Sequence, residues 1–110
     1  MKERAFLVQG SASEPYRVTF LLDGANLSAY CTCPAGQNGI YCKHRFGILR
    51  GERRGIVGDN IDEIVEVVQW LPGTDVGEAI LEMAEAESEF ELAKKRLGAA
   101  KKRVAKAMRD

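Results

Sequence analysis

Three cysteines and the only histidine of this 110-residue chain lie within fourteen residues, and this cluster constrains the fold more than any other feature. Cys31, Cys33, Cys42 and His44 form the pattern C-x-C, eight further residues, and C-x-H. Structural zinc takes four thiolate or imidazole ligands in a tetrahedron. A disulfide framework would leave one of the three thiols over. The cluster therefore predicts one structural zinc ion bound by these four residues.

The two halves of the cluster need different backbone conformations. In an extended segment residues two apart point the same way, so Cys31 and Cys33 can converge on one ion. Residues two apart in a helix lie about 200° apart around its axis, so we expect Cys42 at the entrance of a short helix and His44 in its first turn. Two other interpretations are buried cysteines with a core histidine and a catalytic Cys–His pair. The ligand spacing disfavours the first, and the lack of a nearby orienting base disfavours the second.

The residues before the cluster indicate strands. Residues 5–9 are a short strand candidate, and residues 16–22 alternate apolar and polar side chains with the period of a half-buried strand. Residues 23–26 supply turn formers, and residues 27–31 resume the alternation. We expect an antiparallel meander.

The residues after the cluster indicate helices. A short helix is expected over 42–50, with Gly51 just beyond its end, and the glycine-containing run 51–58 is expected to be a linker. A second helix follows, with Asn60 and Glu63 resembling a capping box. Its expected apolar stripe is Ile61, Ile64, Val65, Val68 and Leu71.

The last segment, from Asp75 to near the C-terminus, is rich in Ala, Glu, Lys and Arg and is expected to be one long helix that Asp75 and Glu78 cap. The expected fold class is α+β, with a small antiparallel meander and a zinc-bound short helix, followed by an amphipathic helix and a long C-terminal helix. Residues 1–58 are expected to form the zinc-finger module and residues 59–110 a helical extension.

These ligands and elements resemble the SWIM zinc finger, whose pattern is C-x-C-x(8)-C-x-H between strands and a helix. Phe46, Ile48 and Leu49 also look like the family's helix, and the resemblance covers about residues 16–51. It implies that Cys31, Cys33, Cys42 and His44 bind zinc, and that the module binds DNA or other proteins. The transposase, ATPase or kinase domains attached in other members have no counterpart here, so those activities are not implied.

Basic residues crowd the segment just after the ligands. These are Lys43, Arg45, Arg50, Arg53 and Arg54, against the single acid Glu52. If the helix continues, Arg50, Arg53 and Arg54 share one face and offer contacts to nucleic-acid phosphates. In the other interpretation these cations only balance a zinc–thiolate cluster of net charge about −1, and Gly51 and Gly55 break the helix.

The long helix carries a regular seam. Met83, Phe90, Leu97 and Val104 recur every seven residues, and alanines recur in the same register three positions later. Glutamates precede the seam's centre and lysines and arginines follow it, which favours an antiparallel dimer over a parallel one. The helix is therefore expected to pair with itself or with another protein; packing on its own zinc module is the alternative.

The net charge and the apolar runs of the sequence exclude some kinds of protein. The formal net charge is zero, so no global basic field indicates nucleic-acid binding. No apolar run reaches the roughly 18–20 residues of a membrane span or forms a signal-peptide core, so we expect a cytoplasmic protein, or a nuclear one in a eukaryote. The function expected is a non-enzymatic zinc module that binds nucleic acid, protein partners or both, with the C-terminal helix mediating association. The alternative is an adaptor that binds only proteins.

Overall fold

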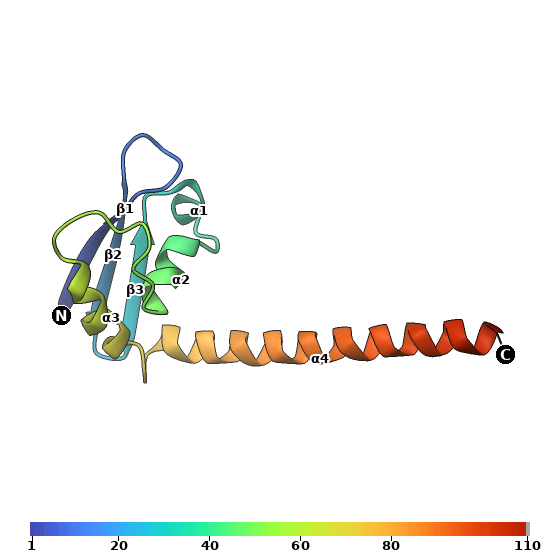
Figure 1. Ribbon diagram of the computed structural model, residues 1–110. Coiled ribbons are helices and arrows are strands. Elements are labelled where there is room, and N and C mark those ends of the chain that lie inside the picture. Colours follow the sequence, from blue (N-terminus) through green and yellow to red (C-terminus); the bar gives the residue numbers. More distant parts are fainter. Residues whose placement is uncertain (110) are drawn as a thin grey trace. The chain divides into compact units, whose positions relative to one another are not determined.

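The computed structural model describes residues 1–109, and contacts divide the chain into one compact unit, Met1–Glu78, and a second that begins at Ala79. Strands β1 (Lys2–Val8), β2 (Tyr16–Asp23) and β3 (Asn26–Cys31) form one antiparallel sheet in that order (Figure 1). The helical elements that follow are α1 (Pro34–Gln37), α2 (Lys43–Leu49), the 3₁₀ turn η1 (Ile61–Glu63), α3 (Ile64–Trp70) and α4 (Asp75–Arg109). The predicted α+β class is confirmed.

The alternation in β2 places its apolar side chains on one face of the sheet. Val18 and Phe20 are fully buried, and Val18 pairs with Phe6 on β1 and with Cys31 on β3. The rings of Phe6 and Phe20 meet edge to face with centroids 6.2 Å apart. Gly24, at φ 59°, begins the two-residue turn to β3, where a left-handed conformation suits glycine.

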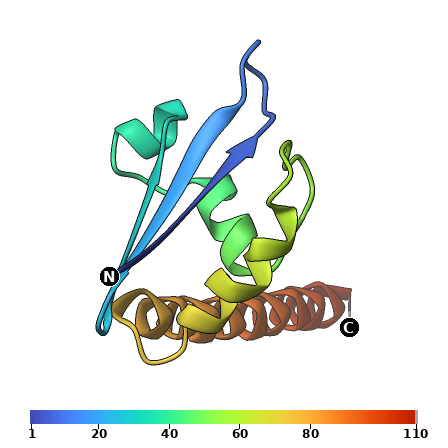
Figure 2. The same ribbon diagram turned by 90° about the vertical axis from the view of Figure 1, so that its left-hand side faces the viewer.

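Helices α2 and α3 lie on the same face of this sheet and close the hydrophobic core (Figure 2). The buried apolar side chains of the core, apart from the cysteines, are Phe6, Val8, Val18, Phe20, Leu27, Ile48, Leu49, Ile64, Val67 and Trp70. They come from all three strands and from both helices. The first unit therefore has a core that does not depend on the cysteine cluster alone.

Helix α3 turns a different face inward from the one predicted. Ile64, Val67 and Trp70 are buried, whereas Val65 is half exposed. The expected stripe assumed a regular helix from residue 61, but the first turn is a 3₁₀ helix, which has three residues per turn rather than 3.6. Within α3 itself, apolar residues lie on more than one side, and packing buries the side with Val67 and Trp70 rather than the side with Val65.

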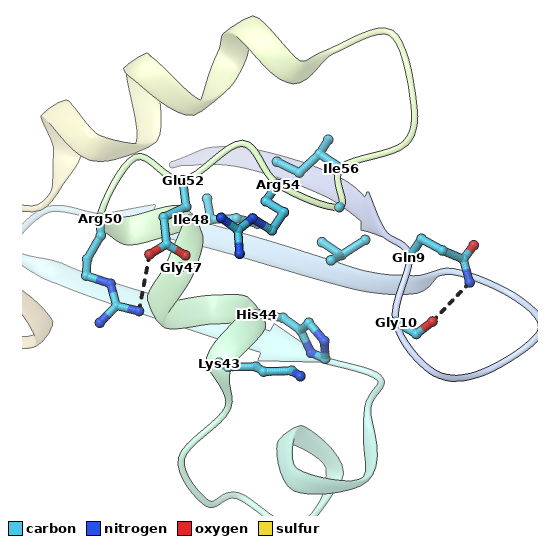
Figure 3. A pocket seen from close by; sticks show the side chains of 12 residues that line it. Gln9, Gly10, Lys43, His44, Gly47, Ile48, Arg50, Glu52, Arg54 and Ile56 are labelled. Carbon is cyan, nitrogen blue, oxygen red and sulfur yellow. Dashed lines mark hydrogen bonds and ion pairs between the residues drawn. The ribbon is translucent and has the colours of Figure 1, made fainter.

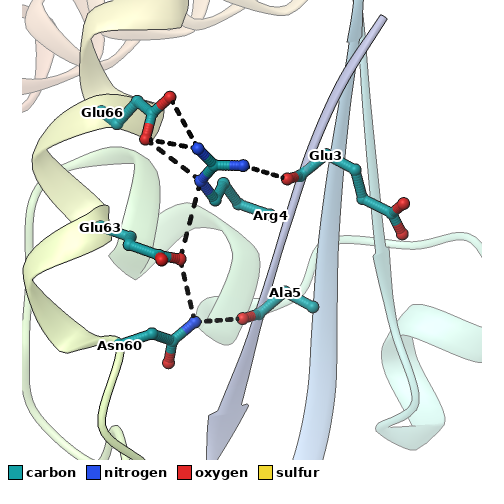
Figure 4. Close-up of polar contacts among 6 residues, drawn as sticks. All are labelled: Glu3, Arg4, Ala5, Asn60, Glu63 and Glu66. Carbon is teal, nitrogen blue, oxygen red and sulfur yellow. Dashed lines mark hydrogen bonds and ion pairs between the residues drawn. The ribbon is translucent and has the colours of Figure 1, made fainter.

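A polar network ties the start of this helical segment to β1 (Figure 4). The guanidinium of Arg4 donates two hydrogen bonds of 3.1 Å to the carboxylate of Glu66. The predicted capping box is wrong, because the side chain of Asn60 caps no helix. Its amide instead donates to the carbonyl of Ala5 at 2.7 Å and to Glu63 at 3.2 Å. Asn60 therefore joins the segment to the edge of the sheet.

The first residue of α4 is fixed by contacts that its own sequence does not reveal. The Thr74 hydroxyl accepts the backbone N–H of Gly77 at 3.1 Å, so Thr74 caps the helix rather than Asp75. The Asp75 carboxylate accepts the backbone N–H of Leu27 at 2.8 Å. Asp75 thus provides a hydrogen-bond acceptor for a backbone N–H on the outer edge of β3, which no strand covers within residues 1–109.

The run 51–58 follows the end of α2 but is not a free linker. Gly51, at φ 83°, follows the last turn of α2, as predicted. Ile56 then forms a bridge with Val8, and the Gln9 N–H donates to the Gly55 carbonyl at 2.7 Å. This segment therefore covers the end of β1 with backbone hydrogen bonds.

From Ala79 onward, helix α4 forms the second unit. Its side chains from Ala84 to Arg109 are all exposed, including the seam residues Phe90, Leu97 and Val104. Among the described residues, no helix combines the length and the apolar character that crossing a membrane requires.

Candidate metal centre and its surroundings

The first two cysteines leave the end of β3 pointing to the same side. Cys31 is the last residue of the strand, and both it and Cys33 are buried. Thr32 between them continues the ladder: its N–H donates to the carbonyl of Arg17 at 3.1 Å, and its hydroxyl accepts the N–H of Arg17 at 2.9 Å. The extended backbone that the C-x-C spacing predicted is therefore maintained by β2.

The residues after Cys33 form one turn of helix, α1. Pro34 fixes its own φ at the first helical position, and the Cys33 sulfur accepts the N–H of Gly36 at 3.3 Å as an N-cap. A Cβ atom at Gly36 would lie 2.8 Å from the Cβ of Cys31 and would also collide with the Cys31 carbonyl oxygen. Glycine is therefore required for α1 to fold this closely against the two cysteines.

The second pair of residues occupies the entrance of α2, as predicted. Cys42 is the N-cap residue with an extended backbone (φ −133°, ψ 119°), and His44 follows in the first turn. The Nδ1 atom of His44 lies 3.7 Å from the Cys31 sulfur and 3.6 Å from the Cys42 sulfur. The Cys33 and Cys42 sulfurs are 3.4 Å apart. His44 thus directs Nδ1, not Nε2, at the three thiols.

These distances fit a tetrahedral zinc site. The four donor atoms all lie within 4.8 Å of one another. Zinc–sulfur bonds of about 2.3 Å and zinc–nitrogen bonds of about 2.0 Å place neighbouring ligand atoms about 3.5–3.8 Å apart. The two sulfur–nitrogen distances, 3.6 and 3.7 Å, have this spacing, and the Cys33–Cys42 sulfur pair, at 3.4 Å, is slightly closer. Four protein ligands complete the coordination, which is the arrangement of structural rather than catalytic zinc.

The metal-free thiols differ in how readily they ionise. Burial, with the neighbouring thiols Cys33 and Cys42 adding to it, raises the pKa of Cys31 to about 12. Burial also opposes ionisation of Cys42, but hydrogen bonds from the backbone N–H of Arg45 and from Cys33 outweigh it and lower the pKa of Cys42 to about 6. At neutral pH a zinc ion therefore finds Cys42 ionised and must displace the proton of Cys31.

The outer side of the His44 ring faces Tyr16 and Gly10. The His44 and Tyr16 rings have centroids 5.1 Å apart and are tilted by 42°. A Cβ atom at Gly10 would lie 2.6 Å from the Tyr16 ring and 3.5 Å from Nε2 of His44. Neither contact was predicted, because Gly10 and Tyr16 lie far before the ligands and carry no metal-binding pattern.

A depression of about 300 Å³ adjoins His44, and we call it the basic depression (Figure 3). Lys43 and His44 line it from the start of α2, and Arg54 lies across from them. Arg50 and Glu52 also line it and form an ion pair of 3.5 Å. Lys43 and Arg54 have no hydrogen bond or ion pair with any side chain in residues 1–109.

The other two basic residues of the cluster are used elsewhere. Arg45 donates hydrogen bonds to the carbonyls of Ala29 at 3.1 Å and Ile40 at 2.6 Å, which holds the loop before α2 against β3. Arg53 forms an ion pair of 3.0 Å with Asp62. The helix ends at Leu49, so Arg50, Arg53 and Arg54 do not share a helical face. The fold brings Arg50 and Arg54 to the basic depression through the turn at 51–55 instead.

Comparison with known families identifies the segment that contains the cluster. Residues 16–49 match the SWIM zinc finger, which is less than half of the chain. No curated protein and no solved structure shows a significant match to the chain. The family match and the Cys₃His cluster together support one structural zinc ion. Residues 16–49 are therefore similar to the SWIM zinc finger, a zinc-binding module that often mediates interactions with nucleic acids or proteins.

Proposed function

We propose that the chain is a non-enzymatic nucleic-acid-binding module in which Cys31, Cys33, Cys42 and His44 hold one zinc ion. The observation that carries the proposal is the basic depression, which lies directly beside the zinc ligand His44. Four side-chain ligands leave zinc no open position for a water molecule, which is why we propose no reaction at the metal. Because thiolate ligands persist in reducing compartments, we place the protein in the cytoplasm, or in the nucleus of a eukaryote.

The charge around the depression favours a polyanion. Three thiolates and Zn²⁺ carry a net charge of about −1, so one cation suffices to balance the centre. Glu52 is already paired with Arg50. Lys43 and Arg54 add two positive charges, so a net positive charge remains after the zinc centre is balanced. Phosphate contacts of this kind bind DNA or RNA without reading sequence.

Salt-dependent binding to random-sequence DNA tests this proposal. We expect zinc-loaded protein to bind with an affinity that falls steeply as salt is raised, because each phosphate contact releases counterions. Replacing Arg50 and Arg54, which both line the basic depression, with alanine should weaken binding and flatten the salt dependence. Wild-type protein that holds zinc and yet binds no DNA at low salt would favour an adaptor that binds only proteins.

A second function is supported by the exposed seam of α4. Phe90, Leu97 and Val104 recur every seven residues and are each more than half exposed. Glutamates dominate the helix before the point midway between Phe90 and Leu97, and lysines and arginines dominate it after that point. We propose that a second copy of this chain covers the seam in antiparallel orientation, because each acidic half then lies beside a basic half.

Sedimentation of two matched variants tests the pairing. Leu97→Glu places a charge on the seam and should give monomers with unchanged zinc content. Leu92→Glu introduces the same charge at another exposed leucine of α4 that lies off the seam, and should leave the dimer intact. A wild-type monomer at high micromolar concentration would mean that the seam awaits another protein or packs within the chain.

A further inference from the structure

A second depression, of about 420 Å³, lies on the other side of Lys43 and His44, and we call it the aromatic depression. Tyr16, Tyr41 and Pro34 line it together with Lys43 and His44. The basic and aromatic depressions therefore share Gly10, Lys43 and His44 and are immediate neighbours. One of them offers cations and the other offers flat apolar rings.

Tyr41 is held in place for stacking. Its ring lies on Phe46 with centroids 4.4 Å apart and an angle of 19°, yet 56% of the residue is exposed. Phe46 covers one face of the ring, so the exposure belongs to the other face and to the edge. A ring that is already fixed by a neighbour loses little freedom when a planar group stacks on its open face.

We infer that the two depressions form one site for single-stranded nucleic acid, with a phosphate between Lys43 and Arg54 and a base against Tyr41. This inference rests on the proposed nucleic-acid binding and names the form of the ligand. A positively charged groove next to aromatic rings is the arrangement by which proteins bind single strands, whose bases are free to stack. In a duplex the bases are stacked on one another, so only the phosphate part of the site can be used.

The histidine adds a third group to the phosphate part. Nδ1 of His44 faces the thiols, so with zinc bound there the ring proton is on Nε2. Nε2 lies toward Gly10, in the part of the surface shared by the two depressions. A phosphate oxygen between Lys43 and Arg54 gives that N–H an acceptor. Gly10 keeps this position open, because a larger residue there would displace the Tyr16 ring.

The test uses the full zinc-loaded chain, fluorescently labelled oligothymidylate, the same strand built from abasic sugars, and a duplex. The variants are Tyr41→Ala and the double variant Lys43→Ala, Arg54→Ala. Their matched controls are Tyr30→Ala, at an exposed tyrosine on β3, and Arg53→Ala, at the arginine paired with Asp62. Zinc content is measured for each, and Tyr41→Leu, which still covers Phe46, serves if Tyr41→Ala loses zinc.

We expect oligothymidylate to bind more tightly than the duplex. Tyr41→Ala should weaken its binding at least about five-fold and leave the abasic strand unaffected, because only a base can stack. The double variant should weaken binding of both the oligothymidylate and the abasic strand. It should also reduce the slope of log affinity against log salt concentration by about 1.4, which corresponds to the loss of two phosphate contacts on a single strand. Tyr30→Ala and Arg53→Ala should match wild type.

The outcomes separate this inference from the proposed function. If wild type binds DNA but the site variants match their controls, or if the duplex binds more tightly, the single-strand site is wrong and nucleic-acid binding stands. If zinc-loaded wild type binds none of the three probes, both are wrong.

Discussion

Gly36→Ala should disturb the zinc centre without touching a ligand. The added methyl group would lie 2.8 Å from the Cβ of Cys31, whereas carbon atoms in contact are about 3.5–4.0 Å apart. The Cys33–Gly36 turn must therefore move by about 1 Å. Overpacking of this kind costs about 1–3 kcal/mol, and loss of the Gly36 N–H···S bond adds about 1 kcal/mol. The movement also separates the Cys33 sulfur from its neighbours.

Gly24→Ala supplies a control that is also destabilised but lies far from the cysteines. Gly24 lies in the turn at the opposite end of β3 from Cys31, and nothing lies within 4 Å of the added methyl group. Its φ of 59° still makes alanine cost roughly 1–2 kcal/mol. Both variants should therefore melt at lower temperature, by about 4–8 °C per kcal/mol for a unit of this size. Only Gly36→Ala should also lose affinity for zinc.

Two measurements distinguish the variants. Trp70, the single tryptophan, is buried in α3 and reports unfolding of the first unit by its fluorescence. Competition with a chelator measures zinc affinity. We expect weaker zinc binding in Gly36→Ala and wild-type zinc binding in Gly24→Ala. Equal zinc affinity in the two variants would refute the argument that close packing of α1 sets the cysteine geometry.

Three further predictions concern the metal, its protons and the start of α4. His44→Ala or Cys33→Ser should lower zinc content from one per chain and, because metal binding is coupled to folding, destabilise the first unit by several kcal/mol in denaturant titrations. As the pH is lowered, zinc affinity should fall about tenfold per pH unit for each thiol proton that zinc must displace, because protons compete with zinc for the sulfurs. The fall should be steeper below the Cys42 pKa of about 6, where Cys42 is protonated as well. Chelator competition across pH measures this, and a pH-independent affinity would contradict it. Thr74→Ala removes the cap of α4 and should cost about 1 kcal/mol, whereas Gly98→Ala, at an open position of the same helix, should add up to about 1 kcal/mol of helix stability by circular dichroism.

The clustering of Cys31, Cys33, Cys42 and His44 could be predicted because its geometry is local. Two residues in an extended strand and two at a helix entrance converge through backbone conformations that short sequence patterns specify. The β-meander was predictable for the same reason, since Val18 and Phe20 repeat with the period of a strand and Gly24 supplies the turn.

Features that depend on distant partners could not be predicted. Asn60 and Asp75 both resemble helix caps, yet their side chains bond to Ala5 and Leu27, which are 55 and 48 residues away in the sequence. The predicted face of α3 was wrong because the helix is apolar on more than one side, and tertiary packing chose the side with Val67 and Trp70. The basic cluster also looked uniform in the sequence, but tertiary contacts engage Arg45 and Arg53 and bring Arg54 across from Lys43. The short sequence pattern predicts which residues cluster at the metal centre, whereas which side chains are free on a surface depends on tertiary contacts.

The two sides of the proposed binding site are held by different parts of the structure. Lys43 lies between two of the metal ligands at the first turn of α2, so zinc coordination fixes the backbone on both sides of it. Arg54 is fixed instead by the backbone pairing of Gln9 with Gly55 and of Val8 with Ile56. In the proposed site zinc would hold one wall, and the edge of β1 would hold the other. We therefore expect a structural metal at this position to affect binding through geometry, without contacting the bound strand.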